Sequence, residues 1–171
     1  AIEEGLASGA ELAPGITVGP FKIITDGSLN TRTAHCVEPY LTVSPPEHGA
    51  MNFPPDEIAD ILTKAQAAGF WLAVHAIGDE ANRIVLDIFE EHSLRGRIEH
   101  AQLVREDDFP RFHELGITAS VQPEHAVDDR DVTDVYWADR TSRAFALRRL
   151  VDSQATLVLG SDAPVSPLDP W

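Results

Sequence analysis

The hydrophobic pattern of the chain changes near residue 20, after which short apolar runs alternate with stretches of helical periodicity. The apolar runs predict strands over residues 21–25, 70–75, 97–101, 117–122 and 156–160. The helical stretches predict helices over residues 58–65, 80–91, about 106–116 and about 140–151. Because parallel strands are joined by crossovers, this alternation is typical of an α/β fold with a parallel sheet.

Three segments interrupt the alternation. Residues 1–19 show little periodicity, and we expect a loose lead-in with room for one short helix. The connection over residues 27–55 contains five prolines, and connections of this length in compact domains are usually functional or mobile. We also expect an acidic loop that follows residue 122 and extends through Asp139.

Four ionisable residues stand at the ends of short apolar runs, namely Lys22, His75, His100 and Asp162. Loops at the C-terminal ends of parallel strands form the functional site, so these side chains are expected at one rim of the sheet. Neutral imidazole is a good ligand for zinc or iron, whereas a lysine ammonium group cannot bind a metal. A single isolated histidine would more often be structural, but two at equivalent strand ends favour a shared site.

Five segments in a fixed order carry a further signal: Lys22 to Leu29, His75 to Asn82, Arg97 to Gln102, Val121 to His125 and Gly160 to Val165. Together they resemble the metal-dependent amidohydrolase superfamily, in particular its YtcJ-like branch, which includes enzymes that cleave N-substituted formamides. The resemblance extends from Gly19 onward. It implies that residues 20–171 are part of a (β/α)8 TIM-type barrel, about strands four to eight, which hydrolyses C–N bonds of non-peptide amides.

The resemblance also assigns roles to individual residues. It implies that one or two divalent metal ions, with zinc expected, are held by Lys22, His75, His100 and Asp162. Asp162 would also be catalytic, because it would accept a proton from the attacking metal-activated hydroxide and pass it to the leaving nitrogen. His125 would be a second catalytic residue that polarises the substrate carbonyl or contacts the substrate.

Structural alternatives exist for each of these roles. Lys22 is implied to be carbamylated, but it would equally well be uncharged or ion-paired with Asp26 or Glu99. Asp162 would serve as a helix or turn cap, which is a common task for aspartate. His125 would be an exposed loop residue.

Four further polar or aromatic residues are candidates for supporting positions. Asp79 is expected to cap its helix or to accept a hydrogen bond from a neighbouring histidine. Gln102, Gln122 and Trp137 are expected to line the pocket, although the tryptophan would also fit a structural position in its loop.

The sequence departs from the superfamily at one important point. Members open their barrel with a His-x-His pair on the first strand, and none of the seven histidines here forms such a pair. We therefore expect strands one to three before Ala1, and a fragment that alone binds zinc weakly and does not turn over amides. The alternative is a non-catalytic barrel remnant that only folds and self-associates.

Composition restricts the partners. The 28 acidic and 13 basic residues give a formal net charge of −15, which argues against binding to nucleic acid or anionic lipid. No apolar run approaches the ~20 residues of a membrane span. The single cysteine excludes an internal disulfide and fits a reducing compartment, so we expect a cytoplasmic protein with a small-molecule amide substrate.

An open barrel has consequences for assembly. A piece with strands four to eight has two free edges, at the strands that carry Lys22 and Asp162. Inward side chains would also lose their packing layer, and those expected inward are Ile23, Val74, Val121 and Val158. Self-association would cover both defects, so we expect a homo-oligomer.

Overall fold

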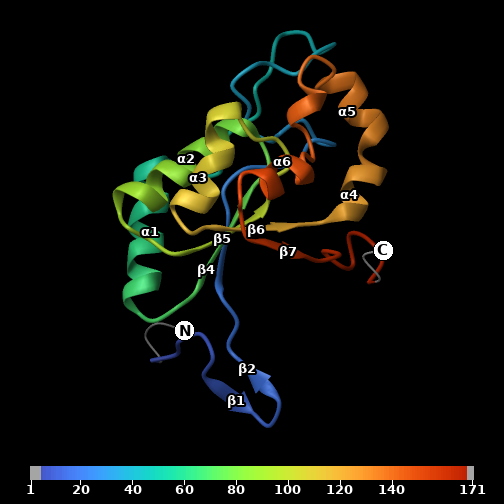
Figure 1. Ribbon diagram of the computed structural model, residues 1–171. Coiled ribbons are helices and arrows are strands. Elements are labelled where there is room, and N and C mark those ends of the chain that lie inside the picture. The colour runs from blue at the N-terminus through green and yellow to red at the C-terminus, as the bar shows by residue number, and fades with distance from the viewer. Residues whose placement is uncertain (1–4, 169–171) are drawn as a thin grey trace.

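A computed structural model describes residues 5–168 and contains a five-stranded parallel sheet (Figure 1). Its strands are β3 (Phe21–Ile24), β4 (Leu72–Ala76), β5 (Gly96–His100), β6 (Thr118–Val121) and β7 (Leu157–Leu159). Each strand pairs in parallel with the next one along the chain. Sequential parallel pairing is the arrangement of a TIM-type barrel, and the predicted partial barrel is confirmed.

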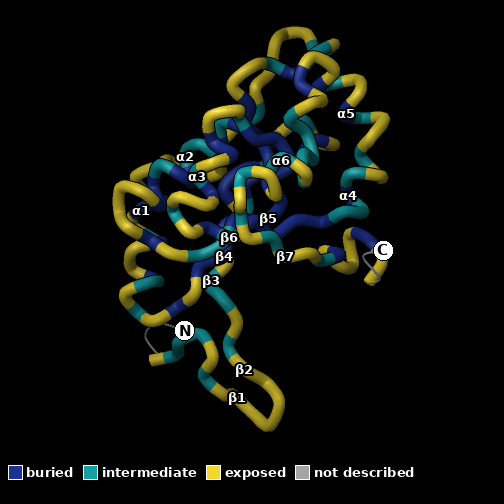
Figure 2. The backbone as a smooth tube through the Cα atoms, in the orientation of Figure 1, coloured by how far each residue is buried: buried dark blue, intermediate teal, exposed yellow. Residues whose placement is uncertain are grey.

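Crossover helices pack on one face of the sheet (Figure 1). They are α1 (Pro55–Ala67), α2 (Asp79–Glu91), α3 (Phe109–Glu114) and α6 (Leu147–Asp152). Pro55 occupies the first turn of α1, where its missing N–H costs nothing, and the buried stripe of α1 contains Ile58 and Leu62. In Figure 2, buried residues are concentrated between these helices and the central strands.

Strand register determines which side chains lie on the opposite face, which would be the interior of a closed barrel. Ile24, His75, Glu99, Ser120 and Val158 are aligned across the five strands, so their side chains share that face. Ile24 and Val158 are about half exposed there, at 52% and 45%. The face combines two exposed apolar residues with polar ones.

The expectation for inward side chains was partly wrong. Ile23, Val74 and Val121 are buried against the helices, because each neighbours an inward residue and successive strand residues point to opposite faces. Val158 lies on the inward face as expected. The uncovered apolar surface is therefore smaller than the sequence suggested.

The lead-in, which we expected to be loose with room for one short helix, has a different structure. Described residues 5–19 contain an antiparallel hairpin, β1 (Glu11–Ala13) and β2 (Ile16–Thr17), which extends away from the sheet (Figure 1). Pro14 and Gly15 form its turn, with Gly15 at φ +78°, and a Pro-Gly pair is the signal of a turn that needs a left-handed residue. Both strands are exposed throughout (Figure 2).

The expected acidic loop contains two helices, α4 (Pro123–Asp128) and α5 (Arg130–Tyr136). Their helical periodicity is hidden in the sequence because only His125 in α4 and Thr133 in α5 are buried. The following helix is shorter than predicted: a 3-10 turn occupies Thr141–Arg143, and α6 begins only at Leu147.

A second buried cluster anchors the proline-rich connection against the 137–145 segment. Trp137 is fully buried and stacks on Tyr40 with ring centroids 6.2 Å apart. The guanidinium of Arg140 donates to the carbonyl oxygens of Glu38 and Pro39 at 2.8 and 2.7 Å. Burial raises the pKa of the Cys36 thiol, in the same cluster, to about 12, so the thiol stays protonated at neutral pH.

No helix among the described residues combines the length and the apolar character needed to cross a bilayer.

Gly78, which precedes α2, provides a test of the tight contact between the proline-rich connection and the sheet. A Cβ at Gly78 would lie 2.0 Å from the carbonyl oxygen of His35, so Gly78→Ala should lower the free energy of unfolding by about 1–3 kcal/mol. At Gly19 no atom of residues 5–168 would lie within 4 Å of such a Cβ, and Gly19→Ala should change stability by less than about 0.5 kcal/mol. Urea unfolding measures both values, and equal stability of the two variants would show that the close approach of His35 to Gly78 is unimportant for stability.

Candidate metal and active site

A cavity of about 550 Å³ opens where the strands end and the chain enters the following loops. Its lining includes all five residues singled out for chemistry: Lys22, His75, His100, His125 and Asp162. They reach it from β3, β4, the end of β5, α4 and the segment after β7. The four residues predicted to share one rim thus line one cavity together with His125, although Lys22 is the second residue of β3 and does not stand at its end.

His75 is the fourth residue of β4 and points to the inward face. Its Nε2 lies 3.2 Å from Oδ1 of Asp26 and 3.2 Å from the carbonyl oxygen of Gly27. Both neighbours are acceptors, so the neutral ring carries its hydrogen on Nε2 and keeps a lone pair on Nδ1.

Asp26 is fully buried directly after β3. Besides facing His75, its carboxylate accepts hydrogen bonds at 2.9–3.0 Å from the backbone N–H groups of His35, Ile77 and Gly78. A buried carboxylate needs hydrogen-bond donors that replace the water it has lost. Here these donors join the ends of β3 and β4 to the proline-rich connection.

His100 ends β5 with backbone angles that only a few residue types adopt. Its φ is +78° and that of Ala101 is +43°, so two consecutive non-glycine residues are left-handed. Nδ1 of His100 lies 2.9 Å from Oε1 of Gln122, whose amide nitrogen donates to the carbonyl oxygen of Ser120. The Gln122 oxygen therefore accepts Nδ1–H, which leaves a lone pair on Nε2 of His100.

The His100 ring lies against two other imidazoles. Ring centroids are 4.6 Å from His75 and 5.9 Å from His125. Burial, followed by the neighbouring His75, Lys22 and His125, lowers the pKa of His100 to about 3. The ring is therefore neutral at physiological pH, which is the form that binds metals.

His125 and Asp162 complete the closest cluster. One potential ligand atom from each of His100, His125 and Asp162 lies within 4.8 Å of the others. Pro123 starts α4, and the first turn of this helix carries the buried His125 inward. Asp162 is exposed at the cavity and has φ +57°, which turns the chain just after β7.

This cluster differs from the ligand set suggested by family resemblance. It contains His125, for which we expected a role toward the substrate, and it leaves out His75 and Lys22 at this distance. The Nε2 of His75 is occupied by Asp26 and Gly27, whereas its Nδ1 is the atom left for a ligand. Both excluded residues still line the same cavity.

The environment of Lys22 lowers the pKa of its side-chain ammonium group. Burial lowers its pKa, while the negative charges of Glu99 and Asp162 act in the opposite direction. The two partners proposed for it have other contacts: Asp26 accepts three backbone hydrogen bonds, and Glu99 accepts one from Arg97 at 2.5 Å.

Several supporting positions differ from expectation. Asp79 is the first residue of α2 rather than its cap, and it accepts hydrogen bonds from Val37 N–H and from Arg143. Trp137 packs in the second cluster, which is the structural alternative that the sequence left open, instead of lining the cavity. Gln102 lines the cavity as predicted, whereas the prediction for Gln122 was wrong: its side chain is buried against His100 and is not part of the cavity lining.

The importance of Asp26 was not apparent from the sequence, in which it appeared only as a partner for Lys22. Its position in the segment Thr25-Asp26-Gly27-Ser28, directly after a strand, was the available signal. The backbone amides that it binds come from residues 9, 51 and 52 positions later, so only folding brings them together.

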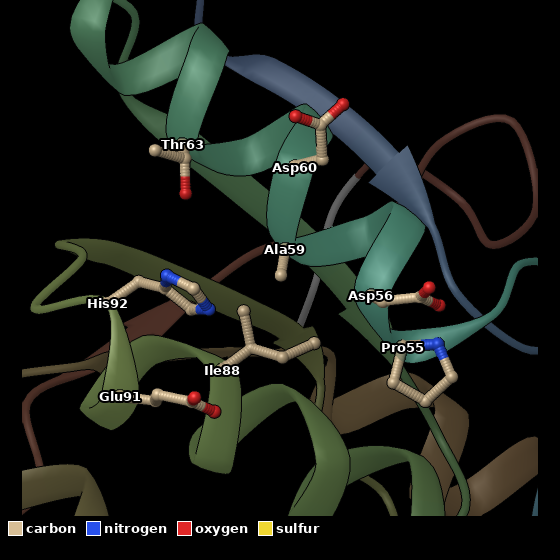
Figure 3. Close-up of a pocket in the computed structure, with 8 residues that line it drawn as sticks. All are labelled: Pro55, Asp56, Ala59, Asp60, Thr63, Ile88, Glu91 and His92. Atoms are coloured by element: carbon tan, nitrogen blue, oxygen red, sulfur yellow. The ribbon is translucent and has the colours of Figure 1, made fainter.

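A second groove lies between α1 and α2, outside the strand-end site (Figure 3). Its volume is about 490 Å³, and acidic residues of both helices line it together with His92. Among described residues 5–168, the only set of at least three His, Cys, Asp or Glu ligands with metal-binding spacing is the one at the strand ends.

The strand-end cluster suits a divalent cation chemically. Two imidazoles and a carboxylate match the nitrogen and oxygen ligands that zinc accepts. His100 offers a free Nε2, and Nε2 of His125 is buried without a hydrogen-bond partner among the described residues. A cation between them would supply that missing interaction.

The low pKa of His100 leads to a prediction about pH. Because the folded pKa lies near 3 and the ordinary value is 6.5, the unfolded chain binds this proton more tightly. The stability that the neutral ring contributes should be complete above pH 6.5 and be lost as the pH falls toward 3. NMR titration of the His100 ring should show no protonation near pH 6, while the urea-unfolded chain titrates near 6.5. Native titration near 6.5 would contradict the described burial.

Comparisons with known proteins identify relatives of this chain. Three curated relatives match the chain. They are Protein LONG AFTER FAR-RED 3 of Arabidopsis thaliana (34% identity, 96% of this chain, 30% of the relative), Putative amidohydrolase YtcJ of Bacillus subtilis (34%, 92%, 30%) and N-substituted formamide deformylase of Arthrobacter pascens (27%, 71%, 24%). The chain thus spans about a third or less of the length of these relatives.

A solved structure shows the same architecture. The chain is similar to an uncharacterized metal-dependent hydrolase from Pyrococcus furiosus, with a TM-score of 0.89, 36% identity, and coverage of 99% of this chain and 35% of that one. The model of the amidohydrolase family matches residues 4–171. The chain therefore belongs to the amidohydrolase family.

Proposed function

We propose that this chain forms the second part of the barrel of a metal-dependent hydrolase that cleaves C–N bonds of small, non-peptide amides. The observation that carries the proposal is the cluster of His100, His125 and Asp162, whose ligand atoms lie within 4.8 Å of one another in the strand-end cavity. The formamide deformylase among the relatives supports an amide as the substrate class. Membership of a hydrolase family supports the reaction type.

His100, His125 and Asp162 would hold a divalent ion, for which zinc is the best fit to the donor set. His75, through Nδ1, and Lys22 are additional ligands in this proposal, because both line the same cavity. When bound, the metal would supply Lewis acidity that lowers the pKa of water and polarises the amide carbonyl.

Asp162 would act as the proton carrier. Its carboxylate is exposed at the cavity, so it is accessible to both the attacking water and the leaving nitrogen. It would accept the proton from the water and donate it to the amine nitrogen as the C–N bond breaks. His125 either binds the ion or orients the substrate carbonyl, and its place in the cluster favours the first role.

Lys22 has two proposed states. A lysine whose pKa is lowered by burial has more of the neutral amine that reacts with carbon dioxide, so carbamylation to a metal-binding carboxylate remains our proposal. The competing state is a lysine that is uncharged or ion-paired with Asp26 or Glu99, and the negative charge of Glu99 raises its pKa. A carbamylated Lys22 would add one negative charge to the site, whereas a neutral amine adds none.

The acidic surface suits a neutral or cationic substrate and disfavours phosphate backbones and anionic lipid. Together with the single, buried Cys36, this supports a cytoplasmic enzyme without nucleic-acid or membrane partners.

A central experiment uses the complete enzyme of which, in this proposal, the chain is a part, and measures hydrolysis of an N-substituted formamide together with the bound zinc. Asp162→Asn retains a side-chain oxygen that can bind zinc, but this oxygen cannot carry the proton. We therefore expect turnover to fall about 10²–10⁴-fold. Zinc content should change much less than turnover. His92→Ala alters an exposed histidine beside the groove between α1 and α2 and should leave both quantities unchanged. If Asp162→Asn hydrolyses as fast as the unaltered protein, the proposed proton carrier is wrong.

The zinc-loaded protein also has to be compared with a preparation of the 171-residue chain alone. We expect the chain alone to bind zinc weakly and to have no useful amidase turnover, because none of its seven histidines forms the His-x-His pair that members of the superfamily add to the site. Tight stoichiometric zinc together with formamide hydrolysis by the chain alone would refute this expectation.

The second candidate function is a self-associating module without catalysis. Two features favour it: Ile24 and Val158 are exposed on the inward face, and β3 and β7 each have one edge that pairs with no other strand among the described residues. Association between copies would cover these surfaces, so we expect a homo-oligomer of the 171-residue chain in sedimentation velocity experiments. A monomer that persists over a hundredfold concentration range would rule out this expectation.

A further inference from the structure

Gln102 and His125 form a buried pair in which one atom of each lacks a partner. The amide nitrogen of Gln102 lies 3.3 Å from Nδ1 of His125. The remaining polar atoms, Oε1 of Gln102 and Nε2 of His125, are buried without a hydrogen-bond partner among the described residues. Both residues are more than nine-tenths buried and line the strand-end cavity, at 4% and 7% exposure.

The orientation of the Gln102 amide determines which nitrogen of His125 carries hydrogen. If the amide nitrogen faces Nδ1, then Nδ1 accepts and the hydrogen of the neutral ring is on Nε2. The buried Nε2–H would then have no acceptor, and it would have no lone pair for a cation. The Gln102 oxygen would also have no donor.

Rotation of the amide by half a turn exchanges oxygen and nitrogen in nearly the same volume. The oxygen of Gln102 then accepts a hydrogen bond from Nδ1–H of His125, at the distance already present. The lone pair of the ring moves to Nε2, which is the orphaned atom. A cation bound by the cluster would therefore satisfy Nε2, whereas it would be repelled by Nε2–H.

The neighbouring histidines follow the same pattern. Oε1 of Gln122 faces Nδ1 of His100 at 2.9 Å, and its orientation is fixed because the amide nitrogen donates to the carbonyl oxygen of Ser120. Oδ1 of Asp26 faces Nε2 of His75. Each of these imidazoles thus donates one N–H to a side-chain oxygen and keeps its other nitrogen free, as metal-binding histidines generally do.

We propose that Gln102 is a positioning residue that presents its carboxamide oxygen to Nδ1–H of His125 and so keeps Nε2 unprotonated toward His100 and Asp162. The pair extends the Gln122–His100 arrangement to the second imidazole of the cluster. The assignment of the tautomer rests on this chain's own contacts, and only the cation that uses Nε2 rests on the proposed function.

The tautomer can be measured directly by long-range ¹H–¹⁵N correlation spectra of histidine-labelled protein without metal. His125 should show a protonated Nδ1 and an unprotonated Nε2, and His100 serves as an internal reference with the same pattern. Gln102→Glu offers only oxygens and should retain the tautomer, whereas Gln102→Leu should lose it. A protonated Nε2 on His125 in the unaltered protein would overturn the proposal. A switch of the hydrogen to Nδ1 in Gln102→Glu would then show that the amide nitrogen of Gln102, and not its oxygen, faces the ring in the unaltered protein.

Zinc affinity of the complete enzyme to which the proposed function assigns this chain gives a second measurement, which separates this inference from the proposed function. Gln102→Leu should weaken zinc binding about 10–100-fold, while Gln102→Glu should bind zinc at least as tightly as the unaltered protein. Gln66→Glu adds the same charge at the end of α1, outside the cavity lining, and is the matched control. Unchanged affinity in a folded Gln102→Leu variant would contradict the positioning role. The expected tautomer without zinc binding in any form would support the inference and contradict the proposed function.

Discussion

The buried carboxylate of Asp26 joins the parts of the chain on which the site depends. It accepts hydrogen bonds from the backbone of the proline-rich connection and of the β4–α2 turn, and it faces the imidazole of His75. Removal of a charge from water is costly unless several donors compensate it, so the carboxylate and these amides have to assemble together. The assembly places the end of β3, the end of β4 and a long loop around one cavity.

The same principle extends along the rim, where side-chain oxygens hold the histidines. Asp26 contacts His75, and Gln122 contacts His100. Hydrogen bonds of this kind fix both the plane and the tautomer of an imidazole, which decides the direction of its free lone pair. Burial keeps His100 neutral, so it adds a ligand atom without adding positive charge. The site is thus prepared by polar contacts behind the ligands as much as by the ligands.

The left-handed residues at the rim have a related structural role. His100, Ala101 and Asp162 all have positive φ, a conformation that costs energy for residues with a Cβ. These residues lie where strands β5 and β7 end, and the turn of the chain there brings the ligand atoms toward one another. Strain of this kind persists only where the surroundings compensate it, as the buried Gln122–His100 contact does.

Local patterns determined the α/β alternation, the sequence order of the five strands and the collection of Lys22, His75, His100 and Asp162 at one rim. These features depend on neighbouring residues and on the general geometry of parallel crossovers, so periodicity alone predicts them. The hairpin at Pro14-Gly15 was also present as a local signal, although we interpreted that segment as a loose lead-in. Helices α4 and α5 were missed because they bury almost no apolar residues.

The membership of the closest ligand cluster was decided by tertiary structure. The first turn of α4 brings His125 into the cluster with Asp162, and the contact of Asp26 with Nε2 of His75 determines which nitrogen of that ring is left for a ligand. Spacing along the chain encodes neither of these contacts. The inward or outward direction of Ile23, Val74 and Val121 likewise required the register, because a shift of one residue exchanges the two faces. The sequence by itself determined which chemical groups reach the rim, whereas only long-range hydrogen bonds and packing decided which of their atoms meet.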